Sequence, residues 1–459
     1  MSNASSYTPA ITFNQRFEKL LFQPIDNAPI VIFRMLFGLL IAIECYGSIG
    51  TGWVRRVLVE PTFTFTMPGF EWLQPLPGDG MYYYFAVMGS MGVLICLGYY
   101  YRFAMLTFAV MWSGVYFMQT TSYNNHYYLL MIISYVMFLL PAHTYASLDV
   151  IRKPSIKTLT MPRWVSLTMI LHMAIVYFFA TKAKFYPDWL DGTFTRILFT
   201  GRAYLEIFGD LFKQPWFHLF IAYSGIAFDG LVVPMLLWKP TRIFAFIASL
   251  FFHIFNSITL RIGIFPYFAL SFGLFFFEPA KLKKLFLWKK PFSDVQSMPL
   301  DFRYKNILIY VLIPYFILQI ALPLRHHFIE GNVFWTEEGH KHSWRMMLRS
   351  RSGTIKFMVE NKATGEREKY DLVSKVSKKQ IKNVSNKPHS IWQMAQRIKK
   401  EYTAEGIDVA VYAECRVSLN GRKSKPFIDS EVDLSTVKFN VWKHNEWILL
   451  YDKEEIFEK

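Results

Sequence analysis

Long apolar blocks are the feature that most constrains how this chain can fold. Blocks of about 16–23 residues with few charges recur along the first part of the chain, and a helix needs about 20 mostly apolar residues to cross a bilayer. The fourth and eighth blocks are short enough to be tilted or re-entrant. We predict about nine spans, at residues 30–49, 82–99, 103–120, 126–142, 164–181, 216–238, 242–260, 264–278 and 306–322.

The distribution of Lys and Arg indicates how these helices are oriented. The chain carries a net charge of +16, which in a soluble protein would suggest a nucleic-acid partner. Here the basic residues flank the apolar blocks, as is typical of membrane topology, so we expect a lipid bilayer and no nucleic acid. With nine spans, the basic connections all fall on one side, before the first span and after the second, fourth, sixth and eighth.

The positive-inside rule makes that side cytoplasmic. We therefore predict a multi-pass integral membrane protein with a cytoplasmic N-terminus and an extracytoplasmic C-terminal domain, a pattern that suits a bacterial inner membrane. Residues 1–322 form the transmembrane catalytic domain in this prediction, and residues 323–459 form the extracytoplasmic domain.

Alternation of apolar and polar residues replaces the apolar blocks after residue 322. The segment WRMMLRSRSGTIKFMVENKATGEREKYDL reads as paired strands with turns at SG and ATGE, and Asn420-Gly421 is a typical hairpin turn. SIWQMAQRIKKEYTAEG has helical spacing and ends in Gly406, a plausible helix cap. NEWILLYD reads as a final strand. The fold class is thus an α-helical polytopic membrane bundle followed by a small soluble α+β domain.

Several common site signatures do not occur in the sequence. There is no CxxC, HExxH, GxGxxG or P-loop, and the three cysteines have no zinc-like spacing. We therefore predict no metal site, no dinucleotide and no ATP chemistry.

Polar groups at the outer ends of the predicted spans are the first candidates for a site. Asn124, Asn125 and His126 lie where the third span meets the fourth, and they can either present donors to a ligand or form a solvated turn. Lys184 lies at the end of the fifth span, shortly before Trp189. It can snorkel to the interface, or it can be a desolvated, neutral lysine that acts as a base.

Polar groups within the spans are the second candidates. His253 and Asn256 are three residues apart and share a helix face. Glu44 and Asp229 are carboxylates inside apolar blocks. Such groups are costly in a membrane and usually face the interior of the bundle or pair with another polar group. A packing role for His253 remains the alternative.

These polar motifs resemble those of a known family. TSYNNHYYL, YFFATKAKFYPDWLDG and FFHIFNSITLRIGIFPY occur in order, and FRMLFG in the first span also fits. They are similar to the vitamin K-dependent γ-glutamyl carboxylases and their bacterial relatives, the HTTM (horizontally transferred transmembrane domain) proteins. WTEEGHKHSWRMMLRSRSG and VSLNGRKSKPFIDSEVDL resemble the lumenal part of the carboxylases. The resemblance covers about residues 30–450.

The resemblance implies an enzyme of the carbon–carbon lyase class. Such enzymes oxidise vitamin K hydroquinone with O2 to the epoxide and use the reaction to carboxylate a protein glutamate with CO2, giving γ-carboxyglutamate. The family's essential lysine falls on Lys184, which would deprotonate the hydroquinone. His126, with Asn125 beside it, and His253 fall on the other catalytic positions. We expect Asn124, Asn256 and Trp189 to bind substrate around them.

The C-terminal domain would present a glutamate-containing protein or peptide. Trp344, Arg349 and Arg351 are the expected binding residues, because arginine pairs well with a carboxylate. His340 and His342 stand where the carboxylases carry tyrosines, so the peptide side departs from the family. Three hypotheses therefore remain: a complete carboxylase, a quinol epoxidase without peptide carboxylation, and a non-catalytic quinone- or lipid-binding protein or transporter.

Overall fold

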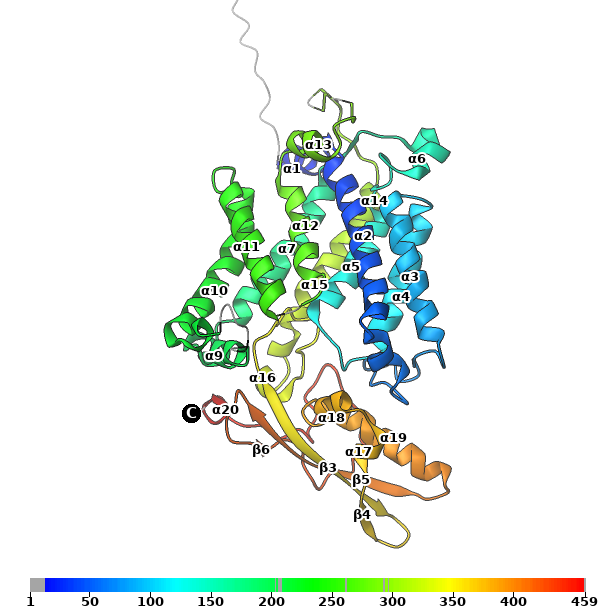
Figure 1. Ribbon diagram of the computed structural model, residues 1–459, viewed down its shortest axis with the longest axis vertical. Coiled ribbons are helices and arrows are strands. Elements are labelled where there is room, and N and C mark those ends of the chain that lie inside the picture. The colour runs from blue at the N-terminus through cyan, green and yellow to red at the C-terminus, as the bar shows by residue number, and fades with distance from the viewer. Residues whose placement is uncertain are drawn as a thin grey trace, which may run out of the picture.

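A bundle of long helices forms the larger part of the molecule, and the C-terminal region (residues 328–457) lies at one end of it (Figure 1). The computed structural model describes residues 13–202, 204, 209–260, 262–291, 294–295 and 297–457. The first twelve residues, and with them the predicted cytoplasmic N-terminus, lie outside the described residues.

Six helices of the described chain are long and apolar enough to cross a membrane. They include a composite run, Lys305–His327, in which a π-helical turn joins α14 (Lys305–Ile307) to α15 (Ile313–Leu324). The other five are α2 (Ala28–Gly50), α3 (Gly80–Leu97), α7 (Trp164–Ala183), α10 (Pro215–Leu237) and α11 (Arg242–Leu260).

The remaining predicted spans are also helical, but they do not meet the same criteria. α5 (Asn125–Leu139) and the run Phe265–Phe276, which contains α12 (Phe265–Ser271), are shorter apolar helices. α4 (Tyr101–Met118) has the length of α3 but is not among the six. The structure therefore supports an integral membrane bundle, and the count of nine spans stays a prediction.

Close contact between α2 and α3 depends on glycines. A side chain at Gly38 would place its Cβ 2.3 Å from the Cys96 nitrogen, and one at Gly92 would lie 2.7 Å from the Ala42 nitrogen. Small residues let helix backbones approach closely within membranes. Gly38 ends the FRMLFG motif, so at least this part of the motif is explained by packing.

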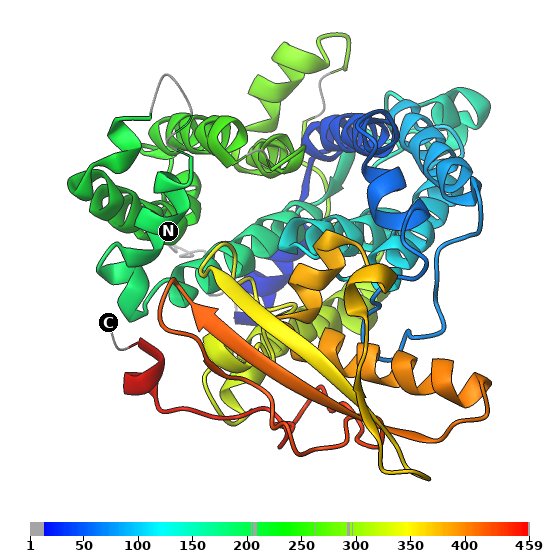
Figure 2. The same cartoon turned by 60° about the horizontal axis from the view of Figure 1, so that its bottom comes forward.

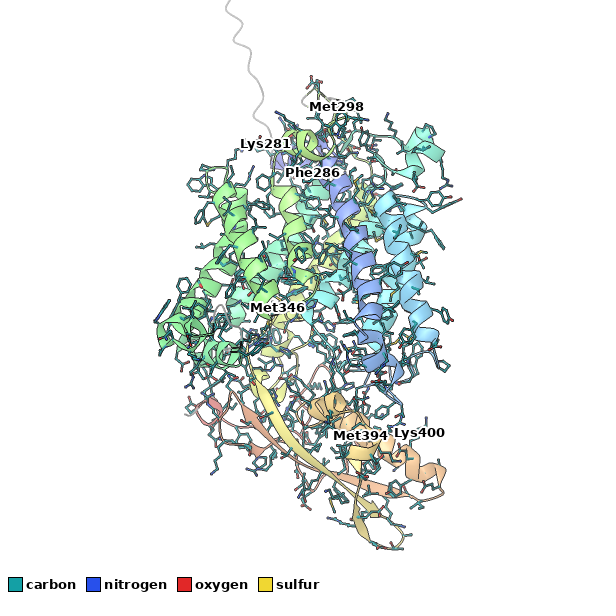
Figure 3. The ribbon with its side chains drawn as sticks, viewed as in Figure 1. Lys281, Phe286, Met298, Met346, Met394 and Lys400 are labelled. Atoms are coloured by element: carbon teal, nitrogen blue, oxygen red, sulfur yellow. The ribbon has the colours of Figure 1, made fainter. Side chains whose placement is uncertain are left out.

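The predicted basic connections gather at the end of the bundle opposite the C-terminal region (Figure 1). This end holds α1 (Phe13–Phe22), α6 (Leu148–Arg152) and α13 (Pro279–Phe286), and Figure 3 labels Lys281 and Met298 there. A short antiparallel pair, β1 (Pro24–Asp26) with β2 (Thr160–Pro162), closes it. Lys290 pairs with Asp26 beside these strands.

The C-terminal region is built on a four-stranded antiparallel sheet in the order β4-β3-β5-β6. Its central pair joins β3 (Arg351–Asn361) to β5 (Val409–Leu419) along their whole length. β4 (Arg367–Lys369) and β6 (Lys425–Pro426) form the edges. Alternate residues of β5 are buried over most of its length, which gives the sheet one covered face.

Helices α18 (Lys378–Val384) and α19 (Pro388–Ala404) lie between this sheet and the bundle (Figures 1 and 2). Gln380 on α18 donates to the Phe63 carbonyl at 2.7 Å, and Gln393 on α19 donates to Thr66 at 2.8 Å. One apolar core continues from the bundle loops into the C-terminal region. Three short helices complete this region: α16 (Val333–Thr336), α17 (Leu372–Lys375) and α20 (Lys453–Phe457).

The predicted elements of the C-terminal region are partly confirmed. The ATGE turn, the Asn420-Gly421 hairpin and the helix before Gly406 are present. The turn predicted at Ser352-Gly353 is wrong, because β3 runs straight through it and pairs with β5 there. NEWILLYD makes one isolated bridge, between Ile448 and Ile428, and is not a strand.

Candidate functional site

A cavity of about 1790 Å³ opens between the bundle and the C-terminal region. Its walls come from α5, α7, α10 and α11 on the bundle side and from residues 337–341 and 345–351 on the other. Nine of the ten predicted site residues line it, namely Asn124, Asn125, His126, Lys184, Trp189, His253, Asn256, Arg349 and Arg351. The structure thus brings together motifs that are far apart in sequence, although their chemical roles stay predictions.

Lys184 caps the C-terminal end of α7 and is buried. Its Nζ forms an ion pair with the Asp229 carboxylate of α10 and also lies 3.3 Å from the Ala180 carbonyl. The Trp189 ring lies 5.3 Å from the same nitrogen. Gly225 of α10 lies beside both residues, since a Cβ placed there would be 3.4 Å from the Trp189 ring and 3.8 Å from the Lys184 side chain. Lys184 is therefore held in the bundle interior and does not snorkel.

The Asn124-Asn125-His126 motif begins α5. Asn124 caps the helix by accepting the Tyr127 N–H at 2.7 Å, a role typical of this residue type. Asn125 is buried, accepts the Tyr123 hydroxyl at 3.2 Å and donates to the Arg345 carbonyl at 3.4 Å. The motif is thus an ordered junction with the C-terminal region and not a solvated turn.

The His126 imidazole faces the cavity among aromatic rings. Its ring centroid lies 5.2 Å from that of Phe265 and 5.0 Å from that of Tyr127. Tyr127 in turn donates to Glu44 at 2.9 Å, which gives this intramembrane carboxylate its predicted polar partner. His126 is therefore fixed in orientation by packing.

His253 and Asn256 lie on one face of α11, as their spacing predicts. His253 is buried, and its Nε2 lies 3.1 Å from the Tyr177 hydroxyl. Its Nδ1 has no hydrogen-bond partner among the described residues. This buried ring nitrogen therefore lacks the hydrogen bond that such an atom usually has.

The opposite wall contains a buried carboxylate that the sequence analysis did not single out. Glu337 pairs with Arg349 and Lys387, and its Oε1 lies 3.7 Å from Arg351 Nε. Burial raises the pKa of Glu337, but these cations outweigh that effect and hold the pKa well below its usual range. Lys387 is the most affected cation, because burial and the two arginines lower its pKa to about 7.

Arg351 acts mainly on the protein's own backbone. Its Nη1 donates to the carbonyls of Phe334 (2.7 Å) and Trp335, and its Nη2 donates to the Asn386 carbonyl at 3.1 Å. Trp344 is the one predicted site residue outside the cavity lining. It is buried and packs on Tyr128, with ring centroids 5.2 Å apart.

We expect Glu337→Gln to destabilise the C-terminal region by about 3–5 kcal/mol, because it leaves buried cations uncompensated. The ordinary unfolded-state pKa of Glu is about 4.3, and the folded-state pKa is lower. The stabilisation is therefore present above about pH 4.3 and is lost as pH falls through the folded-state pKa. Thermal unfolding should show the same deficit at about pH 5 and about pH 6. Glu360→Gln, in the exposed pair with Arg367, is the control and should have little effect. Equal midpoints of thermal unfolding for Glu337→Gln and Glu360→Gln would contradict this expectation.

A second charged group joins the Lys184 segment to the C-terminal region. Asp188, in α8 (Pro187–Leu190), is completely buried. It receives two 2.6 Å hydrogen bonds from Arg422 and one of 2.6 Å from Asn420. The Asn420-Gly421 turn therefore does more than reverse the chain. Asn420 and the adjacent Arg422 hydrogen-bond Asp188, which lies four residues after Lys184. α9 (Thr193–Thr200) continues this segment along the cavity.

Comparison with protein families agrees with these motifs. Residues 22–280 match the family model described as HTTM domain. Residues 304–454 match the model described as vitamin K-dependent gamma-carboxylase, lumenal domain. No solved structure matches the chain. The two matches meet at the cavity, since the first contains Lys184, His126 and His253 and the second contains the Glu337 wall.

Proposed function

Because the chain belongs to the HTTM family and carries the lumenal domain of the vitamin K-dependent gamma-carboxylases, we propose that it is a vitamin K-dependent γ-carboxylase-like enzyme. It oxidises vitamin K hydroquinone with O2 to the epoxide and couples this reaction to carboxylation of a protein glutamate by CO2. The observation that carries the proposal is the single cavity onto which Lys184, His126, His253 and the C-terminal region all open.

The cavity suits a lipid-soluble quinol together with a peptide side chain. Ligand pockets usually measure about 300–1000 Å³, and this one measures about 1790 Å³. Its bundle side is lined by apolar side chains such as Val176, Phe228 and Phe252, and the unpartnered His253 Nδ1 offers a polar contact there. The aromatic and aliphatic walls also exclude water, which would quench a strong base.

Lys184 and Asp229 together supply the proton acceptor. In apolar surroundings an ion pair loses much of its advantage over the neutral pair, so a proton can pass from Lys184 Nζ to the Asp229 carboxylate. The neutral amine then accepts the hydroxyl proton of the quinol. His126 and His253 are positioned to bind the quinol oxygens. This role of Asp229 is an addition to the neutral lysine expected from sequence.

We expect Asp229→Asn to lower the rate of quinol epoxidation by about 10²-fold, because Lys184 loses its proton acceptor. Epoxide formation by purified protein in nanodiscs measures the effect, and gel filtration checks that the variant is folded. Glu44→Gln is the matched control, since Glu44 is an intramembrane carboxylate outside the cavity lining. Equal activity of Asp229→Asn and wild type would remove Asp229 from the proposed mechanism.

A quinol epoxidase without peptide carboxylation is the second candidate. The ion pair between Glu337 and Arg349 favours this candidate. Arg349 was expected to bind the substrate carboxylate, but its guanidinium is already paired with a carboxylate of the protein. The two candidates separate in one assay that follows reduced vitamin K, O2, labelled CO2 and a glutamyl peptide. Epoxide with fixed label supports the carboxylase, and epoxide without it supports the epoxidase. Folded protein that binds quinol and forms neither product overturns both.

The proposed membrane arrangement follows from the same function. We propose nine spans, with the C-terminal region and the mouth of the cavity outside the cytoplasm, so that quinol enters from the bilayer and the peptide from the aqueous side. Clustering of the basic connections at the opposite end of the bundle supports this orientation (Figure 1). Cysteine accessibility at Lys400 and at Lys281, which Figure 3 labels at opposite ends, tests it.

A further inference from the structure

The C-terminal wall of the cavity has far more positive than negative charge. Ten Lys or Arg residues line the cavity, against three Asp or Glu residues. The acids are already engaged within the protein, because Asp229 pairs with Lys184, Glu337 with Arg349 and Lys387, and Glu338 with His444. A cavity of this kind attracts an anionic ligand.

Six of these ten cations form no ion pair among the described residues: Arg202, Arg325, Lys341, Arg345, Lys379 and Lys382. The ion pairs of this wall join Glu337 to Arg349, Arg351 and Lys387, and none formed within the described ranges includes Arg345 or Lys341. The Lys341 Nζ has a 3.4 Å contact with the Met67 sulfur, a weak acceptor. Arg345 is the buried one of these six residues, and a buried charge is normally paired.

Arg345 is the best placed of the six cations to bind an anion. The residue is buried, with 8% of its surface exposed. Its Nε has no partner among the residues the structure describes, and its Nη1 has only a 3.5 Å approach to His326 Nε2. The guanidinium carbon stacks 4.3 Å from the Phe334 ring centre. A flat guanidinium held on a ring is oriented for a planar carboxylate.

The backbone around Arg345 contains several residues in a strained conformation. Glu337, His342, Trp344 and Met347 all have positive φ, between 49° and 64°. Such conformations are costly for residues with side chains and gather at functional sites. The Arg345 carbonyl accepts from Asn125, the neighbour of His126. Figure 3 labels Met346, the next residue, where the bundle meets the C-terminal region.

We propose that Arg345, assisted by Lys341, forms the subsite that binds the γ-carboxylate of the glutamyl substrate. This inference rests on the proposed function, and it assigns to Arg345 the task that sequence reasoning gave to Arg349 and Arg351. Arg349 and Arg351 pair with Glu337, and Arg351 also donates to the backbone carbonyls of residues 334–335. Both arginines therefore stabilise the cavity wall instead of binding substrate. The bound carboxylate would lie against the guanidinium of Arg345, which stacks on Phe334.

The test uses the full chain in nanodiscs and a fluorescent peptide with one glutamate, together with its glutamine counterpart. We expect Arg345→Met to weaken binding of the glutamyl peptide by about 10- to 100-fold, the usual effect of losing a hydrogen-bonded charge. The variant should no longer distinguish glutamate from glutamine, and Arg345→Lys should recover part of the discrimination. In turnover, the loss should appear as a higher KM for peptide. Arg367→Met, an exposed cation on β4 outside the cavity lining, is the control.

The outcomes separate this inference from the proposed function. Carboxylation by wild type with unchanged peptide affinity in Arg345→Met overturns the subsite alone. Epoxidation without carboxylation overturns the proposed carboxylase, while peptide binding that depends on Arg345 still sustains the subsite. If wild type binds the two peptides equally, the subsite is wrong whichever product forms. A folded Arg345→Met variant, checked by gel filtration and quinol binding, is required in each arm, and Arg345→Lys replaces it if methionine prevents folding.

Discussion

Replacing Lys184 by methionine is expected to lower the rate of vitamin K epoxidation by about 10²–10⁴-fold, the usual contribution of a positioned general base. Methionine keeps much of the volume of the side chain but cannot take up the quinol proton. The loss should appear in epoxide formation with and without a glutamyl peptide, because deprotonation of the quinol precedes any use of the peptide. Epoxide is measured directly on protein in nanodiscs.

Lys182→Met is the matched control for this experiment. Lys182 lies two residues earlier at the same helix end, but its Nζ points outward and contacts His327 Nε2 at 2.9 Å. We expect the control to retain activity. Quinol binding by Lys184→Met distinguishes lost chemistry from lost binding. Comparable epoxidation by the two variants would contradict Lys184 as the base.

Asp188→Asn is expected to lower stability by about 3–5 kcal/mol, because it leaves the largely covered Arg422 side chain, 13% exposed, without its acid. Asp188 is completely buried and accepts three hydrogen bonds of 2.6 Å from the C-terminal region. The C-terminal region should therefore separate from the bundle more readily. A lower midpoint of thermal unfolding and faster proteolysis near residue 328 would report this separation.

A double-mutant cycle isolates the Asp188–Arg422 pair. Arg422→Met should be damaging alone, and the double variant should be less damaged than the sum of the two, because neither buried charge then remains alone. Asp210→Asn, in a largely exposed pair with Lys213, is the control from the same connection between α7 and α10. If the losses of stability from Asp188→Asn and Arg422→Met were additive, the ion pair would not stabilise the contact between the bundle and the C-terminal region.

The positions of the helices could be read from the sequence because the signal is local. Each predicted apolar block is a helix, and His253 and Asn256 share a face as a three-residue spacing requires. The sheet was harder to predict. Ser352-Gly353 has the composition of a turn, but Gly353 is needed because a side chain there would collide with the Ser385 carbonyl, 1.9 Å from its Cβ.

The partners of charged residues could not be predicted, because they depend on contacts between distant segments. Asp229 was expected to find a polar group, yet nothing in the sequence identifies Lys184, 45 residues earlier, as that group. Asp188 and Arg422 are 234 residues apart. Two adjacent acids, Glu337 and Glu338, are typical of a solvated surface, whereas both side chains are buried and each has its own partners. The prediction that Arg351 binds substrate did not include the main-chain carbonyls to which its guanidinium donates.

The Asp188 contact also bears on how such proteins can be recombined. Lys184 and Asp188 lie within one short stretch of chain, and Arg422 lies in the C-terminal hairpin, so the sequence on either side of residue 322 is not two interchangeable modules. A chimera that joins this bundle to a C-terminal region from a relative must supply a matching arginine, or it must also exchange the segment around α8 and α9. The crossover point of a chimera should therefore be chosen so that Asp188 and its arginine partner stay together, and not simply at the end of the last apolar helix.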